Sequence, residues 1–199
     1  MHFIGRGAEA ILYKKNSYLI KKRVSKGYRI QELDERLRKD RTSKETNLMV
    51  KARRNGANVP VIIKKDMNEF KITMEYIDGE VLKDFLEKAN TKKIDKLCSD
   101  IGKNITKLHF AGIFHGDLTT SNMILKNGEL YIVDFGLGKF TNKVEDFAVD
   151  LHLMKRALIS KHNSVWKKVF KKILENYNIR EKKKVLERMK KIEKRGRYS

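Results

Sequence analysis

Hydrophobic and polar residues divide the chain into a strand-rich first part and a helical second part. The segments 1–13, 17–24 and 70–77 alternate apolar and polar residues or are rich in β-branched and aromatic ones, which is typical of strands. A helical pattern follows Thr42 and meets a stop signal at Gly56. This part of the chain therefore predicts a sheet accompanied by one helix.

Beyond these strands the apolar residues recur every three or four positions, as they do on one face of a helix. Four segments show this spacing: 94–112, 147–158, 165–177 and 185–192. Between the first two, short apolar runs flank Asn127-Gly128, a strong signal for a β-hairpin. We therefore predict an α+β fold of two lobes, a strand-rich N-lobe over 1–77 and a mostly helical C-lobe over 78–199.

Polar residues suited to phosphate chemistry lie on both sides of the predicted hairpin. Asp117 and Asn122 precede it on one loop, and Asp134 opens an Asp-Phe-Gly turn directly after it. Asp117 is placed to accept a proton from an attacking hydroxyl or water, while Asn122 and Asp134 offer the hard oxygens that Mg²⁺ prefers. Both halves in this order are far more specific than Asp-Phe-Gly alone, and they predict a site for Mg²⁺ and nucleotide phosphates.

A phosphate-binding loop and a lysine are expected upstream of such a site. The segment Gly5–Ala10 is a candidate glycine-rich phosphate cover, although alanine stands at the third glycine position. Strand alternation puts Lys21 and Arg23 on one face and Lys22 on the other, and periodicity does not say which face is the cleft. Glu45, on the helix that follows, is the candidate partner of the chosen lysine.

Charge is spread unevenly along the chain. Residues 155–199 hold 17 Lys and Arg against 4 Glu, so +13 of the formal net charge of +21 lies there. This asymmetry indicates a polyanionic partner, because each phosphate neutralised by Lys or Arg releases a counterion; a solvated helix face explains the lysines equally well. At the end, Arg195, Arg197 and Tyr198 surround a helix-breaking Gly196, a combination able to grip phosphate and stack on a base.

Two further observations exclude other classes of protein. The single cysteine, Cys98, rules out an internal disulfide and a cysteine-rich zinc site. No apolar stretch approaches the ~18 residues of a membrane span, and the first residues have no secretory pattern. We therefore expect a cytoplasmic protein without membrane contact.

Several longer motifs together point to one family. They are Gly7-Ala8-Glu9-Ala10, Ile20-Lys21-Lys22-Arg23, Lys26-Gly27-Tyr28-Arg29, Arg41-Thr42-Ser43-Lys44-Glu45, Met74-Glu75-Tyr76-Ile77-Asp78-Gly79, the loop 115–122, the turn 134–137 and Arg195-Gly196-Arg197-Tyr198. With these motifs the sequence resembles a protein kinase, and specifically the small atypical kinase/ATPase subunit of the KEOPS (EKC) complex, the PRPK-like family related to the RIO kinases. The resemblance spans essentially the whole chain and implies a two-lobed protein-kinase-like fold with a reduced C-lobe.

The resemblance also implies roles for the polar residues. Lys21 would bind the α- and β-phosphates of ATP and pair with Glu45. Asp117 would be the catalytic aspartate, and Asn122 and Asp134 would bind Mg²⁺.

The resemblance also implies further ATP-site residues. They are Gly5, Gly7, Ala8 and Glu9 in the glycine-rich loop, Met74 as gatekeeper of the adenine hinge, and Glu75 and Ile77 through their backbone groups. One aspartate, Asp146 or Asp150, would brace the loop 115–122, which the resemblance implies is the catalytic loop.

The sequence departs from ordinary protein kinases in two places, after the Asp-Phe-Gly turn and within the loop 115–122. No proline follows Pro60, so an Ala-Pro-Glu motif is absent, and 13 residues separate Gly136 from Asp150. Gly116 stands where ordinary kinases carry the arginine of His-Arg-Asp. We therefore expect constitutive assembly of the site, or gating by a partner, in place of activation-loop phosphorylation.

The function that the resemblance implies is that of an ATP- and magnesium-dependent atypical Ser/Thr kinase or ATPase in the formation of threonylcarbamoyl-adenosine on tRNA. Its expected partners are KEOPS subunits, especially the threonylcarbamoyltransferase subunit, and tRNA through the basic C-terminal region. One alternative is a small-molecule phosphotransferase of the aminoglycoside-kinase type, which usually carries a larger helical insertion. Another is a non-catalytic tRNA-binding scaffold, which the intact set of polar ATP-site residues disfavours.

Overall fold

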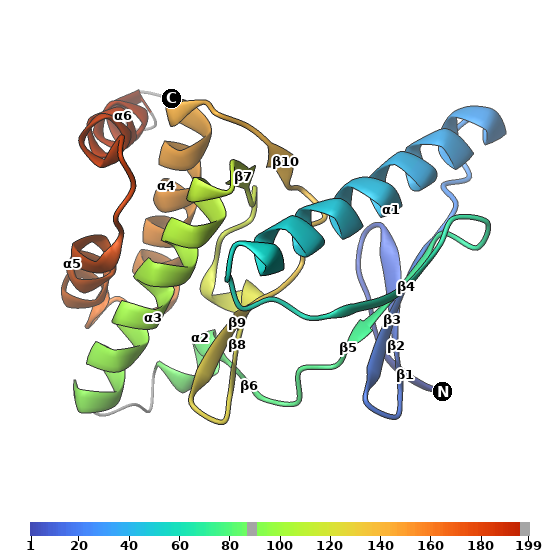
Figure 1. Ribbon diagram of the computed structural model, residues 1–199, viewed down its shortest axis with the longest axis horizontal. Coiled ribbons are helices and arrows are strands. Elements are labelled where there is room, and N and C mark those ends of the chain that lie inside the picture. The colour runs from blue at the N-terminus through green and yellow to red at the C-terminus, as the bar shows by residue number, and fades with distance from the viewer. Residues whose placement is uncertain (87–90, 196–199) are drawn as a thin grey trace.

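A five-stranded antiparallel sheet and one long helix build the first lobe of the computed structural model, which describes residues 1–86 and 91–195. The strands lie in the order β1-β2-β3-β5-β4 (Figure 1). Their bounds are β1 His2–Arg6, β2 Ala10–Lys15, β3 Tyr18–Arg23, β4 Ile62–Asp66 and β5 Lys71–Glu75. The predicted strand segments are confirmed, the first of them as two strands joined by a tight turn. Strand β4 was not predicted, because it is short, exposed at three of five positions and irregular between Ile62 and Lys64.

Helix α1, Gln31–Arg54, runs obliquely across this lobe with its last turns toward the other lobe (Figure 1). It begins well before Thr42, so the predicted start of the helix was wrong. The early turns lack an apolar stripe, and their one buried residue is Asp34, whose carboxylate accepts a 2.7 Å hydrogen bond from Arg38 Nε. An ion pair within the helix, between Asp34 and Arg38, therefore stabilises a segment that hydrophobic periodicity does not detect.

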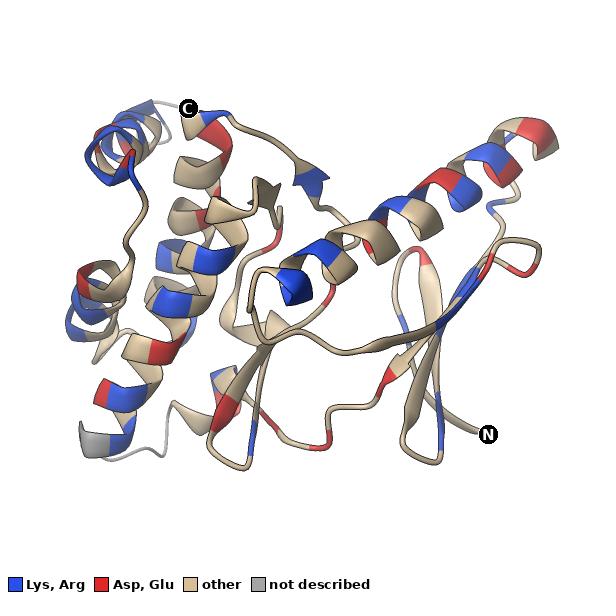
Figure 2. Cartoon of the chain, viewed as in Figure 1, with Lys and Arg blue, Asp and Glu red and all other residues tan. Residues whose placement is uncertain are grey.

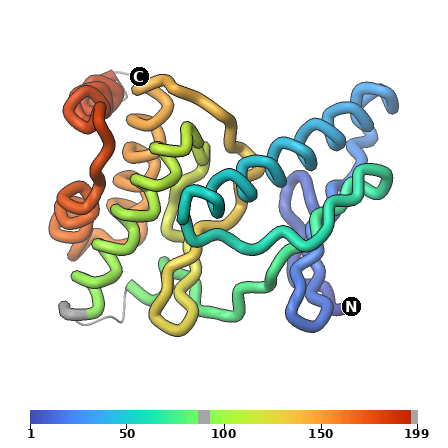
Figure 3. Tube along the Cα trace, in the orientation of Figure 1, coloured from blue at the N-terminus to red at the C-terminus, as the bar shows by residue number. Residues whose placement is uncertain are grey.

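Helices dominate the second lobe, where the predicted helical segments are confirmed. Its helices are α2 Leu82–Phe85, α3 Thr91–Phe110, α4 Val144–Lys161, α5 Trp166–Asn176 and α6 Lys182–Arg195. Helix α5 packs on α3 and α6 packs on α4, and the tube in Figure 3 shows these last two helices on the side of the molecule opposite the N-terminal strands. Together with the antiparallel N-lobe sheet, this arrangement confirms the predicted two-lobed α+β fold.

Short strands hold the loops of the second lobe. Strand β8 Met123–Lys126 pairs with β9 Glu129–Ile132 and with β6 Glu80–Val81, while β7 Ile113–Phe114 pairs with β10 Lys139–Phe140. The hairpin turn places Asn127 at φ 52° and Gly128 at φ 79°, the left-handed region that Asn-Gly turns require. The loop before the hairpin and the turn after it are thereby fixed to one rigid element.

Two general expectations concern the chain as a whole. The boundary expected between residues 77 and 78 lies in the connection from β5 to β6, and it stays a prediction. Across the two described ranges, none of the helices combines the length and apolar character needed to cross a membrane.

The α3–α5 contact provides a test of packing. A Cβ atom built on Gly102 of α3 would lie 2.5 Å from the backbone oxygen of Ile173 on α5. We expect Gly102→Ala to lower the free energy of unfolding by about 1–3 kcal/mol, because the helices must move apart. Urea unfolding measures the change; Gly27→Ala is the control, since no described atom lies within 4 Å of its Cβ position. Equal stability of Gly102→Ala and wild type would contradict the packing described here.

Candidate active site

Lys21 connects three separate segments of the chain. Its Nζ lies 2.7 Å from Oε1 of Glu45 on α1 and 2.8 Å from Oδ1 of Asp134 on the turn after the hairpin. Strand β3 turns Lys21 and Arg23 to this inner face and leaves Lys22 exposed, which answers the question that periodicity left open. The structure thus brings together three of the predicted site residues.

The electrostatics keep Lys21 and Asp134 charged. Burial lowers the pKa of Lys21, but the Glu45 and Asp134 carboxylates outweigh burial, and the pKa lies above its usual value. Burial raises the pKa of Asp134, but the Lys21 ammonium outweighs it, and the pKa lies below its usual value. The Asp134 side chain keeps 55% of its surface exposed, so this carboxylate remains open to a ligand.

Asn122 joins the catalytic loop to the turn at Asp134. Its Nδ2 donates to the backbone oxygen of Asp117 at 2.9 Å and to Oδ2 of Asp117 at 2.8 Å. Its backbone oxygen accepts a 3.0 Å hydrogen bond from the amide of Val133, the residue before Asp134. The amide oxygen of Asn122, the atom that a metal ion would use, takes part in neither side-chain bond.

His115 packs beneath these residues. The side chain is buried, its Nε2 lies 3.1 Å from the backbone oxygen of Val133, and its Nδ1 accepts from the amide of Asp117 at 3.3 Å. Its ring lies 4.7 Å from the ring of Phe135. Burial lowers the pKa of His115 and outweighs the opposing effect of the Asp150 carboxylate, so a neutral imidazole braces the loop.

Asp150, and not Asp146, braces the catalytic loop. Its carboxylate is fully buried and accepts from the backbone amides of His115 at 2.7 Å and Gly116 at 2.9 Å. Asp146 instead accepts from the Thr141 hydroxyl at 2.5 Å. The open choice between the two aspartates is therefore decided by the backbone amides that Asp150 reaches.

Gly116 is glycine for a steric reason. Its φ is +82°, and a Cβ atom built on it would lie 2.6 Å from the backbone oxygen of Leu137. The short segment after Asp134 packs directly against the catalytic loop at this point, so the space at position 116 excludes any larger side chain.

Known proteins of similar sequence identify the family of this chain. The family model of the protein kinase domain matches residues 1–169. The KEOPS complex subunit Bud32 of Pyrococcus abyssi is 43% identical to this chain, over 100% of the chain and 96% of the relative. The chain belongs to the Bud32 family of protein-kinase-like proteins.

Members of this family also occur inside longer proteins. A probable bifunctional tRNA threonylcarbamoyladenosine biosynthesis protein of Methanococcus maripaludis is 43% identical over 99% of this chain, which spans 36% of that protein. Among solved structures, the Rio2 kinase–ADP/Mg²⁺–phosphoaspartate complex from Chaetomium thermophilum superposes with a TM-score of 0.65 at 16% identity, covering 98% of this chain and 72% of that one. The structural likeness to Rio2 supports the kinase-like fold.

The glycine-rich turn is attached to α1 through Glu9. The amide of Gly7 donates to the Ala10 oxygen at 2.9 Å, closing the turn, and the Glu9 carboxylate accepts from Arg41 of α1. Arg23 Nη1 lies 3.6 Å from the same carboxylate. The sequence pattern indicates no role for these two arginines, although strand alternation places Arg23 on the face of Lys21. The prediction that Glu9 belongs to the ATP site stays a prediction.

The expected adenine hinge lies at the end of β5. Met74 and Ile77 are buried, and the Glu75 carboxylate accepts from the Val61 amide at 3.4 Å and from Lys126 Nζ at 3.5 Å. Through Lys126 of β8, Glu75 contacts the second lobe. The gatekeeper and hinge roles of these residues stay predictions.

Basic residues gather on the last helices. Figure 2 shows Lys and Arg along α5 and α6. Arg195 ends α6, whereas Arg197 and Tyr198, the other predicted tail contacts, lie outside the described residues.

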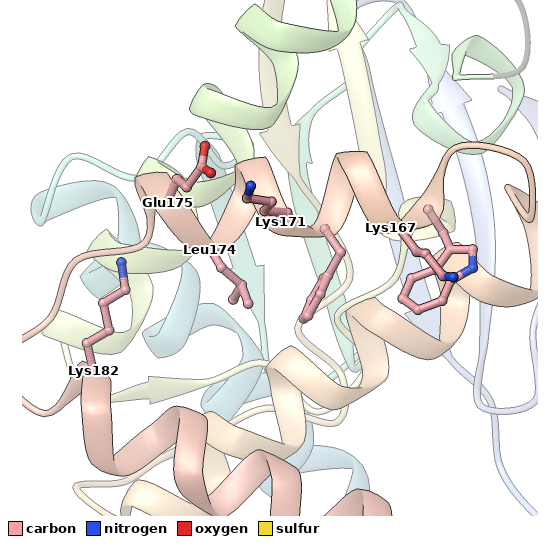
Figure 4. A pocket seen from close by; sticks show the side chains of 7 residues that line it. Lys167, Lys171, Leu174, Glu175 and Lys182 are labelled. Carbon is pink, nitrogen blue, oxygen red and sulfur yellow. The ribbon is translucent and has the colours of Figure 1, made fainter.

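A separate groove lies beside α5, away from Lys21 and Asp134. Trp166, Phe170 and Leu174 of α5 form its apolar floor, in a cavity of about 450 Å³. Lysines of α5 and Lys182 of α6 stand around it (Figure 4). Val169 and Ile173, on the neighbouring face of the helix, are fully buried, so α5 contributes both to the core and to this groove.

The buried His115 predicts a pH dependence of stability. Its folded pKa lies below the ordinary 6.5, so the unfolded chain binds the proton more readily. The contribution of neutral His115 to the free energy of unfolding is complete above pH 6.5. It is lost as the pH falls below that value, by at most about 1.4 kcal/mol per pH unit for one group. We expect the stability difference between wild type and His115→Gln to narrow from pH 7 to pH 5, measured by urea unfolding. His2→Gln, at an exposed histidine, is the control; an unchanged pH slope in His115→Gln would contradict the assignment.

Proposed function

We propose that this chain binds ATP with Mg²⁺ between its lobes and catalyses phosphoryl transfer or ATP hydrolysis as a KEOPS subunit in tRNA threonylcarbamoyladenosine formation. The observation that carries the proposal is the convergence at Lys21. Its ammonium contacts Glu45, and it contacts Asp134 across 113 positions of sequence, on the inner face of β3. An ammonium positioned there is suited to hold phosphate oxygens.

The donor atoms present fit a magnesium ion. Mg²⁺ usually takes one or two carboxylates and completes its shell with water and substrate phosphates. Asp134 offers an exposed carboxylate and Asn122 an amide oxygen, and within the described ranges no cluster of three or more His, Cys, Asp and Glu could enclose a metal alone. When bound, Mg²⁺ would neutralise charge on the phosphates that it bridges.

The other residues would position the reacting groups. Asp117 is half-buried, and the two hydrogen bonds from Asn122 fix its orientation. In this position Asp117 would align a water or hydroxyl and accept its proton. Neither Gly5 nor Gly7 is crowded by the described residues, with 3.7 Å from a Gly7 Cβ to the Ala10 oxygen as the nearest approach. Glycine at these positions would let backbone amides come close to phosphates.

The acceptor is proposed to be water or a hydroxyl presented by a partner. Helix α4 begins at Val144, so only residues 138–143 lie between the turn 134–137 and the next helix. These residues include β10, which pairs with β7 of the same lobe. A segment this short offers no platform for docking a peptide substrate.

The proposed partners are other KEOPS subunits, especially the threonylcarbamoyltransferase subunit, and tRNA. The Methanococcus maripaludis relative, named as bifunctional, supports a second activity working beside this one. The lysines of α5 and α6 support a tRNA surface, since they concentrate positive charge on one side of the C-lobe (Figure 2).

Substitutions at the reacting groups test the catalytic proposal. We expect Asp117→Asn and Asp134→Asn to reduce ATP consumption by at least 100-fold, on the order of one lost catalytic group, with unfolding curves close to that of wild type. Asp78→Asn, at a carboxylate that is 79% exposed, is the control. Phosphate release and phosphoprotein formation are measured with and without tRNA and partner subunits. Wild-type turnover in either variant would refute the site.

Substitutions on α6 test the tRNA surface. We expect the double variant Lys190→Ala, Lys191→Ala to weaken tRNA binding and to reduce the slope of log K against log salt by about 1 to 2. Removal of residues 195–199 should act in the same direction. The control, Lys15→Ala with Lys22→Ala, changes net charge equally at exposed sites of the N-lobe. The affinity for tRNA is measured across a salt titration. Equal effects of the two double variants on this affinity would exclude a specific tRNA surface on α6.

A further inference from the structure

Glu45 is held by two cations, one on each carboxylate oxygen. Lys21 Nζ lies 2.7 Å from Oε1, and Arg23 Nη2 lies 2.5 Å from Oε2. Glu45 is 1% exposed and Arg23 is 3% exposed, so this contact is fully enclosed. Hydrogen bonds between ionised partners in such surroundings are strong and short.

The Arg23 guanidinium lies where four segments meet. Its strand is β3, its first carboxylate belongs to α1, and its Nη1 lies 3.6 Å from Glu9 at the end of the glycine-rich turn. A Cβ atom built on Gly136 would lie 3.6 Å from Lys21 Nζ and 4.0 Å from Arg23 Nη2, so both cations border the Asp134 turn. The buried Nε of Arg23 has no hydrogen-bond partner among the described residues, and the two carboxylates therefore fix the group.

A phosphate bound by Lys21 would share the single positive charge of that ammonium with Glu45. The Lys21 ammonium is already shared between Glu45 and Asp134. A phosphate that drew the ammonium away would leave a buried carboxylate short of compensation, which is costly in the absence of another cation. Arg23 supplies that second cation, and its planar fork can address Glu45 and Glu9 with separate nitrogens.

We infer that Arg23 is a positioning residue, which holds Glu45 and helix α1 in place while Lys21 engages the phosphates of the nucleotide. The inference rests on the proposed function. It would explain constitutive assembly of the site, one of the two alternatives expected for a chain whose Gly116 replaces the arginine that ordinary kinases use for activation-loop phosphate.

The neighbouring lysine on the same strand provides a matched control for the test. Arg23→Met removes the charge and keeps a long side chain, whereas Lys22→Met makes the same kind of change on the exposed face. Turnover and KM for ATP with Mg²⁺ are measured on the full chain with tRNA and partner subunits, alongside thermal unfolding. We expect kcat/KM to fall at least tenfold in Arg23→Met and to stay at the wild-type value in Lys22→Met. Wild-type kinetics in Arg23→Met would overturn the inference.

A double-mutant cycle separates positioning from general support of the fold. If Arg23 acts through Glu45, combining Arg23→Met with Glu45→Gln should cost little more than the worse single variant. If the reductions in kcat/KM of the two single variants multiply in the double variant, the inference is wrong. Arg23→Lys keeps a cation but lacks the planar fork that reaches Glu45 and Glu9 with separate nitrogens, and we expect turnover about threefold below wild type. This variant decides the matter if Arg23→Met does not fold, since wild-type turnover in it would then count against the inference.

Further variants distinguish failure of this inference from failure of the proposed function. If Lys21→Met and Asp134→Asn retain wild-type turnover, the proposed function is wrong, and the role of Arg23 falls with it. If both abolish turnover while Arg23→Met behaves as wild type, only the role assigned to Arg23 is wrong.

Discussion

The shared ammonium of Lys21 is the contact on which the arrangement of the lobes depends. It contacts Glu45 of the first lobe and Asp134 of the second, so one cation holds the sheet, α1 and the turn after the hairpin at a common point. Burial alone would favour a neutral lysine, yet two carboxylates within hydrogen-bonding distance keep the charge in place. An ion pair in this position contributes less as net stability than as specificity, because it admits one relative placement of three segments.

A second, buried network holds the catalytic loop from below. The Asp150 carboxylate accepts hydrogen bonds from the backbone amides of His115 and Gly116. His109 Nε2 lies 3.3 Å from the same carboxylate. The Tyr177 hydroxyl, from the end of α5, lies 2.8 Å from His109 Nδ1. The catalytic loop is therefore supported by three helices of the C-lobe as well as by the segment that follows Asp134.

Much of this molecule could be predicted from its sequence, for identifiable reasons. The hairpin followed from Asn127-Gly128, whose backbone conformation few other residues tolerate, and the helices of the C-lobe followed from apolar periodicity. The early turns of α1 escaped prediction because ion pairs, and not an apolar stripe, stabilise them. The contact between Arg23 and Glu45 could not be predicted from the sequence either. Strand alternation shows which face of β3 carries Arg23, but it does not show which residue of another element packs against that face.

The contact between Gly116 and the backbone oxygen of Leu137 constrains how this chain could diverge. Arginine at position 116 would clash with the segment after Asp134, because its Cβ atom alone would lie 2.6 Å from the Leu137 backbone oxygen. A lineage could acquire a phosphate-sensing arginine only after that segment had lengthened and moved away. Sterics therefore fix the order of the two changes: the segment must move before arginine can replace Gly116. While the segment stays compact, it prevents conversion into a phosphorylation-controlled kinase.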